Sequence, residues 1–141
     1  MRLILALTLL LSLVACSSTK PDPEDIVSVP ADRVLAYQQP LQDAGEVVVT
    51  RDFAWRGGGC YIGLMIDREL AARVHVGEVV RLQVPAGQRI VSIGTDPLDD
   101  TLCGKLRLRR EKLARVEAGQ ALEFRIIVDN EVGFDIVPLE H

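Results

Sequence analysis

The stretch from residue 61 to residue 94 constrains the fold most strongly. It contains four short apolar runs, which are separated by Asp67-Arg68, Gly77-Glu78 and Pro85-Ala86-Gly87. Turn signals that recur about every eight to ten residues are typical of antiparallel hairpins. Apolar residues alternate along residues 61–66, and some of the runs are apolar on both faces. This pattern predicts an all-β fold, a small antiparallel β-sandwich of about seven to eight strands.

Length and composition limit the kind of core that the chain can form. The 141 residues fit a single domain with a modest core. Hydrophobic residues make up 48% of the chain but aromatic residues only 4%, so the core is expected to be aliphatic. The formal net charge of −4 gives no electrostatic reason to expect a nucleic-acid partner.

The N-terminus carries an export signal. After Met1-Arg2, residues 3–14 form an apolar run, which is too short to span a bilayer. Residues 1–15 are therefore predicted to be a signal peptide. The sequence that ends this run, Leu13-Val14-Ala15-Cys16, resembles the lipobox of bacterial lipoproteins.

The lipobox resemblance implies that Cys16 is acylated and that the protein is held in a membrane. Attachment by two or more acyl chains is effectively permanent. Ser17 and Ser18, rather than Asp, follow the cysteine, which in that family implies the outer membrane and a domain that faces the periplasm. The alternative is an ordinary signal peptide with a chance cysteine at this position.

The segment after Cys16 is predicted to be a tether. Residues 17–31 contain three prolines and three acidic residues and little that could pack. Fully extended, they could reach roughly 50 Å at about 3.3 Å per residue. Residues 32–39 are expected to form either a short helix or an extended segment across the first strand. Residues 16–45 are thus assigned to the lipidated cysteine, the tether and a lead-in, and residues 46–141 to the β-sandwich domain.

The remaining strands are expected on both sides of the central stretch. Residues 46–55 are predicted to be the first strand, and the glycines at residues 57–59 a flexible linker or a bulge. No Gly-Lys-Ser/Thr follows these glycines, so they do not form a phosphate-binding loop. Residues 105–117 fit either two short strands, the interpretation we favour, or a helix. Residues 121–128 and 132–137 flank a hairpin turn.

The order of these signals resembles a family, the small bacterial lipoproteins of the DUF2846-like type. The resemblance covers residues 49–93 and extends more loosely to residue 137. It rests on Arg51-Asp52, Gly57-Gly58-Gly59, Cys60-Tyr61-x-Gly63, Ile66-Asp67-x-x-Leu70-Ala71-Ala72-Arg73 and Val84-Pro85-Ala86-Gly87. It implies a sandwich of the transthyretin or carboxypeptidase-regulatory sort. These motifs mark turns and strands, so the family contributes no catalytic residues.

Cys60 and Cys103 remain once Cys16 is assigned to lipid. An exported domain folds in an oxidising compartment, where two such cysteines are expected to form a disulfide. A reactive thiol would need a neighbouring base, a helix N-terminus or a Cys-x-x-Cys partner, and the sequence near either cysteine has none of these. The bridge is expected to join the glycine-rich turn to the aspartate-rich loop that follows Gly94.

The sequence offers no catalytic or metal-binding set, so we predict neither an enzyme nor a cofactor nor a bound metal. Asp96, Asp99 and Asp100 lack the spacing of a calcium loop and are expected to cap turns. His75 is the one histidine besides the C-terminal residue. A hydrolase would have to combine it with Ser28 or Ser92, and neither serine lies in a nucleophile elbow.

A possible recognition surface is expected around the two loops that the disulfide would join. Its candidate residues are Arg51, Trp55, Arg56, Tyr61, Asp96, Asp99 and Asp100. Core packing of Trp55 is the alternative.

Three functional hypotheses follow from the sequence. The first is a lipid-anchored, non-enzymatic binding or structural module of the cell envelope with a protein partner. The second is a periplasmic immunity or inhibitor protein against a toxin or a cell-wall hydrolase. The third is a small hydrolase that uses His75.

Overall fold

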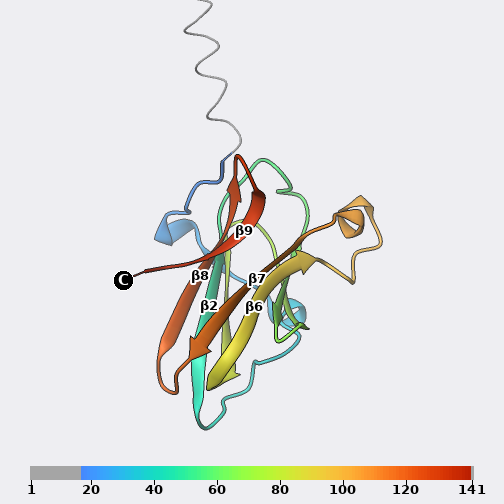
Figure 1. Cartoon of the computed structure of the whole chain (residues 1–141). Helices are drawn as coiled ribbons and strands as arrows, with labels where there is room; N and C mark the ends of the chain where they lie inside the picture. The colour runs from blue at the N-terminus through green and yellow to red at the C-terminus, as the bar shows by residue number, and fades with distance from the viewer. Residues whose placement is uncertain (1–16, 141) are drawn as a thin grey trace, which may run out of the picture.

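Two β-sheets pack face to face in the computed structural model, which describes residues 17–140 (Figure 1). The predicted signal peptide and Cys16 lie outside the described residues. The predicted all-β sandwich is confirmed, although two strand pairs of one sheet are parallel rather than antiparallel. The described residues form nine strands rather than seven or eight, because a two-residue strand near the N-terminus joins one sheet. No helix among residues 17–140 has the length and apolar character needed to cross a membrane.

The first sheet has five strands and mixed direction. Its order is β1 (Val27–Ser28), β5 (Glu78–Pro85), β2 (Ala44–Arg51), β8 (Ala121–Asp129) and β9 (Gly133–Pro138). Strand β2 runs antiparallel to β5 but parallel to β8, and β1 runs parallel to β5. The β2–β8 pair therefore places a strand from the N-terminal part of the chain beside one from the C-terminal part.

The second sheet has four strands and is fully antiparallel. Its order is β4 (Glu69–Val74), β3 (Ile62–Ile66), β6 (Gly87–Thr95) and β7 (Arg109–Val116). Asp67 and Arg68 form the β3–β4 turn, with φ angles of 50° and 68°. A two-residue hairpin turn needs positive φ at both positions to match the right-handed twist of its strands. The Asp67 carboxylate stabilises this turn because it accepts the Ile90 N–H at 2.9 Å and pairs with Arg89 at 3.1 Å.

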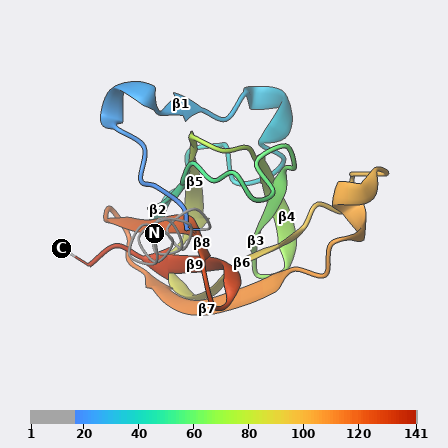
Figure 2. The ribbon, with the colours of Figure 1, turned by 90° about the horizontal axis from the view of Figure 1, so that it is seen from above.

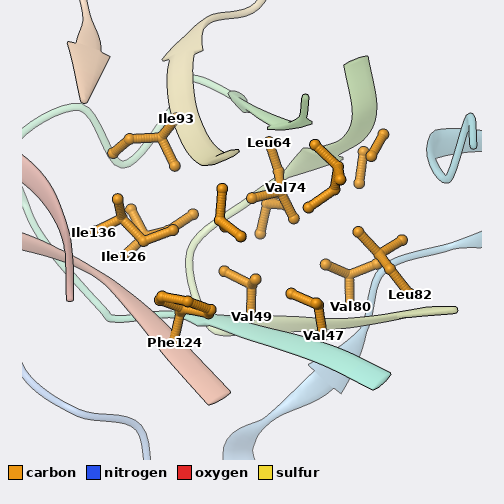
Figure 3. Close-up of a cluster of buried hydrophobic side chains, with 14 of the residues drawn as sticks. Val47, Val49, Leu64, Val74, Val80, Leu82, Ile93, Phe124, Ile126 and Ile136 are labelled. Atoms are coloured by element: carbon orange, nitrogen blue, oxygen red, sulfur yellow. The ribbon is translucent and has the colours of Figure 1, made fainter. Parts of the chain in front are cut away.

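The core is aliphatic, as expected from the composition. Alternate residues of both sheets point inward and meet between them (Figure 3). Burial of each such side chain contributes about 1.5–3 kcal/mol. The cluster includes Val47, Val49, Leu64, Val74, Val80, Leu82, Ile93, Phe124, Ile126 and Ile136.

The N-terminal segment differs from the expected tether. Ser18 hydrogen-bonds to Val128 near the end of β8, Thr19 to Phe53 just beyond the end of β2, and Val27–Ser28 forms β1. A 3₁₀ turn, η3 (Ala31–Arg33), follows, and Val34 then makes an antiparallel bridge to Ala72. The prediction was wrong for this segment because its backbone groups pair with exposed strand ends, which no local pattern in the segment reveals.

Two further boundaries also differ from the sequence predictions. Strand β2 ends at Arg51, so residues 52–55 belong to a loop rather than to the first strand. Residues 105–117 contain the end of the 3₁₀ turn η4 (Leu102–Lys105) and the single strand β7. The preference for strand over helix is therefore confirmed, with one strand in place of two.

Candidate recognition loops

Two loops at one end of the sandwich are joined by the Cys60–Cys103 disulfide. We call residues 52–61, between β2 and β3, the first loop, and residues 96–108, between β6 and β7, the second loop. The Cα atoms of the two cysteines lie 5.6 Å apart, within the usual range for such a bond. The predicted bridge between the glycine-rich turn and the aspartate-rich loop is confirmed.

The first loop folds around the side chain of Arg51. The guanidinium donates to the carbonyl oxygens of Cys60 at 2.7 Å, Val74 at 2.8 Å and Gly57 at 2.9 Å. It also lies 5.6 Å from the centre of the Phe134 ring. Burial lowers the pKa of Arg51 to about 10, so the side chain stays charged at neutral pH. Arg51 is only 1% exposed, and its assignment to a recognition surface was wrong.

The glycine-rich turn is needed because the loop packs tightly. Gly57 has a φ of +69°, and a Cβ atom there would lie 2.6 Å from the Phe134 ring. A Cβ atom on Gly58 would lie 2.6 Å from the Ala54 carbonyl oxygen, whereas one on Gly59 would meet no atom within 4 Å. Two of the three glycines therefore serve close packing, and the turn is a compact structure rather than a flexible linker.

Aspartates hold the second loop in shape. The buried Asp96 carboxylate pairs with Arg73 at 2.7 Å and accepts the Leu98 N–H at 3.0 Å. Asp99 accepts the hydroxyl and the N–H of Thr101, and these two bonds lower the pKa of the Asp99 carboxyl. Turn capping is thus confirmed for these two aspartates, and Asp96 is too buried to belong to a recognition surface.

Asp100, the third predicted aspartate, is exposed. Thr95 and Gly104 shape the rest of the second loop. Thr95 donates its hydroxyl to the Leu106 carbonyl and accepts the Leu108 N–H at 3.2 Å. Gly104 permits a close approach, because a Cβ atom there would lie 1.9 Å from the Asp99 carbonyl oxygen. Within residues 17–140, no three His, Cys, Asp or Glu side chains are grouped to hold a metal ion.

Tyr61 is half-buried and contacts side chains of its own domain. Two guanidinium groups contact its ring, with Arg33 at 4.6 Å and Arg73 at 4.8 Å from the ring centre. The His75 ring lies 5.7 Å from it, centre to centre, in a T-shaped arrangement. Tyr61 therefore fastens the N-terminal segment to β4 and is not free for recognition. The sequence could not show this, since Arg33 is 28 positions away.

Glu78 completes this group of charged side chains. Its carboxylate accepts two hydrogen bonds from Arg33, at 2.5 and 2.8 Å, and one from the backbone N–H of His75 at 2.7 Å. Burial opposes its ionisation, but the bonds from Arg33 and His75 outweigh burial and hold the pKa of Glu78 below its usual range. The candidate nucleophiles Ser28 and Ser92 lie in different sheets, on β1 and β6.

The exposed part of the predicted surface is smaller and more apolar than expected. Trp55 is 96% exposed, which excludes core packing, and Arg56 next to it is also exposed. On the second loop Leu102 is 80% and Leu98 59% exposed, and neither leucine was predicted as a contact residue. The segment that carries η4 projects from the sandwich in both views (Figures 1 and 2). A clue in the sequence was the placement of leucines among turn-forming residues.

A depression of about 370 Å³ lies on the outer face of the five-stranded sheet. The N-terminal segment borders it at Lys20 and Ile26, and Val48 and Val79 form its apolar floor. Arg125, at its margin, is bound by the buried Asp52 carboxylate. Its charged margin is thus partly occupied by ion pairs within the domain.

Comparison of the chain with protein-family models, with curated proteins and with solved structures finds no match in any of the three. The resemblance to the DUF2846-like lipoproteins therefore stays a prediction.

Proposed function

We propose that this protein is a lipid-anchored, non-enzymatic binding module of the bacterial cell envelope, acylated at Cys16 and facing the periplasm from the outer membrane. We further propose that it binds another envelope protein through the second loop. The observation that carries the proposal is the pair of exposed leucines, Leu98 and Leu102, on a loop fixed by a disulfide.

The anchor is supported by the N-terminal sequence. Leu13-Val14-Ala15-Cys16 ends a short apolar run, as a lipobox does. The disulfide between Cys60 and Cys103 supports export, because such bonds persist in oxidising compartments such as the bacterial periplasm.

Protein binding is supported by the rigidity of the second loop. Asp96, Asp99 and Thr101 fix its turns, and Cys103 ties it to the first loop. A loop that is already ordered loses little conformational entropy when it binds. Single exposed leucines are common on protein surfaces, but two on one braced and projecting loop favour a contact with a partner.

Photo-crosslinking in cells tests the binding proposal. A photoreactive residue is placed at position 102 in one strain and at position 113 in another, because Leu102 and Leu113 are both 80% exposed. Leu113 lies on β7, outside the loop. We expect position 102 to capture one reproducible envelope protein and position 113 to capture none. Equal capture at both positions, or none at position 102, would contradict the proposal.

The anchor is tested separately by the variant Cys16→Ser. We expect it to move the protein from the membrane fraction to the soluble periplasmic fraction, because the acyl chains have no other attachment point. Unchanged membrane retention would show that Cys16 is not the anchor. If the crosslinked partner is a toxin or a cell-wall hydrolase, the more specific role of an immunity or inhibitor protein is favoured.

A further inference from the structure

The point at which the chain enters the domain is fixed at the same end as the two loops. The Ser18 N–H donates to the Val128 carbonyl at 2.9 Å, and the Val128 N–H donates to the Ser18 hydroxyl at 2.9 Å. Thr19 and Phe53 exchange both backbone hydrogen bonds, at 2.8 and 3.0 Å. Figure 1 shows that the described chain starts beside the hairpin of β8 and β9.

This fixed entry brings the domain close to any lipid attached at Cys16. Only Ser17 stands between Cys16 and the hydrogen-bonded Ser18. At about 3.3–3.6 Å per residue, two residues span roughly 7 Å. The end of the domain that holds Ser18 would therefore lie next to the head groups of the membrane rather than some 50 Å from it.

This end carries a mixed apolar and basic surface, which we call the Trp55 face. Its apolar members are Trp55, Leu106 and Val132, all of them exposed. Trp55 follows Phe53 by two residues and so lies near the entry of the chain. Tryptophan is enriched at membrane–water interfaces, where its ring is apolar and its N–H is polar.

Arginines supply the basic part of the Trp55 face. Arg56, Arg107 and Arg110 border a shallow depression of about 210 Å³ together with Leu106 and Val132. Among residues 17–140, no carboxylate lies within 4.0 Å of these three guanidinium groups.

Acidic residues near the Trp55 face reduce this positive charge only in part. Asp129, in the β8–β9 turn, accepts the N–H groups of Glu131 and Val132. Glu131 is exposed in the same turn. Arg110 donates to the carbonyl oxygens of Arg109 and Val132, each at 3.0 Å, but none of the three arginines has a carboxylate partner among the described residues. An exposed tryptophan beside arginines of this kind suits a surface of anionic phosphate head groups.

We propose that the Trp55 face lies against the lipid bilayer, with the Trp55 ring at the interface and Arg56, Arg107 and Arg110 on lipid phosphates. This inference rests on the proposed anchor at Cys16. It gives the domain a fixed orientation in which the second loop projects beside the membrane, where a membrane-bound partner is within reach.

Tryptophan fluorescence of the acylated protein tests this orientation, because Trp55 is the single tryptophan of the chain. The full acylated protein is reconstituted in vesicles of phosphatidylethanolamine and phosphatidylglycerol. We expect emission at shorter wavelength than in water, quenching by lipids brominated on the acyl chain, and protection from iodide.

The possible outcomes separate the inference from the anchor. If the protein floats with the vesicles but Trp55 stays open to iodide and is not quenched by brominated lipid, the inference is overturned and the anchor stands. If the protein does not float with the vesicles, both are overturned. If a photoreactive residue at position 55 captures an envelope protein in cells while Trp55 stays open to iodide in vesicles, the face binds protein, and the lipid contact is overturned.

Matched variants show which residues hold the orientation. Arg56→Gln and Arg107→Gln are each expected to lower the ratio of docked to undocked domain about fivefold, as expected for one basic residue near an anionic surface. Arg115→Gln, at the other end of β7, is expected to leave the ratio unchanged. In the double variant Trp55→Phe with Leu113→Trp, the new tryptophan is expected to remain open to iodide. Loss of docking in Arg115→Gln, or none in the other two, would overturn the inference.

Discussion

The Ser18 hydroxyl donates a hydrogen bond to the buried carboxylate of Asp52 at 3.1 Å. The same carboxylate is held by the guanidinium of Arg125. Two positions after the predicted lipid attachment site, the chain is thus already part of the domain. This contact replaces the expected tether with a fixed entry and sets the orientation proposed above.

Ser18→Ala should loosen the N-terminal segment. The variant removes the bond to Asp52 and the acceptor of the Val128 N–H, which should lower the free energy of unfolding by about 1 to 2 kcal/mol. Hydrogen exchange of the Thr19 amide is expected to become faster. Ser17→Ala serves as the control because Ser17 is exposed. An unchanged exchange rate in Ser18→Ala would show that this bond does not hold the segment.

Arg51→Met should destabilise the first loop and the protein as a whole. It removes the guanidinium that donates to the carbonyl oxygens of Gly57, Cys60 and Val74, of which Gly57 keeps a bond from the Cys60 N–H, and we expect a loss of about 3 kcal/mol in urea unfolding. Arg51→Lys should restore only part of this loss, because an ammonium group cannot reproduce the planar arrangement of donors. Wild-type stability in Arg51→Met would rule out this role.

Removal of the disulfide should lower stability and free the second loop. The two cysteines are 43 positions apart, for which the chain-entropy model gives about 4 kcal/mol before any change in strain. Urea unfolding of the double variant Cys60→Ser with Cys103→Ser measures this loss. Limited proteolysis should then cut within residues 96–108. If the sites of cleavage and the stability match the wild type, the bridge does not brace the loop.

Acid should weaken the attachment of η3 to the sandwich. The pKa of Glu78 is lower in the folded protein than in the unfolded chain, so its contribution to stability is complete above the unfolded value of about 4.3. This contribution is lost as the pH falls through the folded pKa. A pH series of urea midpoints should therefore show a smaller acid-induced loss in Glu78→Gln than in the wild type. Equal losses would mean that Glu78 does not account for the acid sensitivity.

Local patterns predicted much of the sandwich. Turn residues such as Asp67-Arg68, together with alternating apolar residues in the strands, act over a few positions, so the hairpins follow from the sequence. The disulfide was also predictable, because only Cys60 and Cys103 remained to pair in a domain that is predicted to be exported. Turn capping by Asp96 and Asp99 is a local property as well.

Only the tertiary structure decided which charged and aromatic residues are exposed. Arg51 is buried because the loop at Gly57 and Cys60 and the end of β4 at Val74 close around it. Tyr61 is covered because Arg33 and Arg73 approach it from other elements. The sequence by itself determined most of the strands and their turns, since those depend on neighbouring residues. It also determined the bridge, since only two cysteines remained to pair. The fixed entry at Ser18 and the exposure of Trp55 depend on contacts between residues far apart in the chain, which only the folded protein brings together.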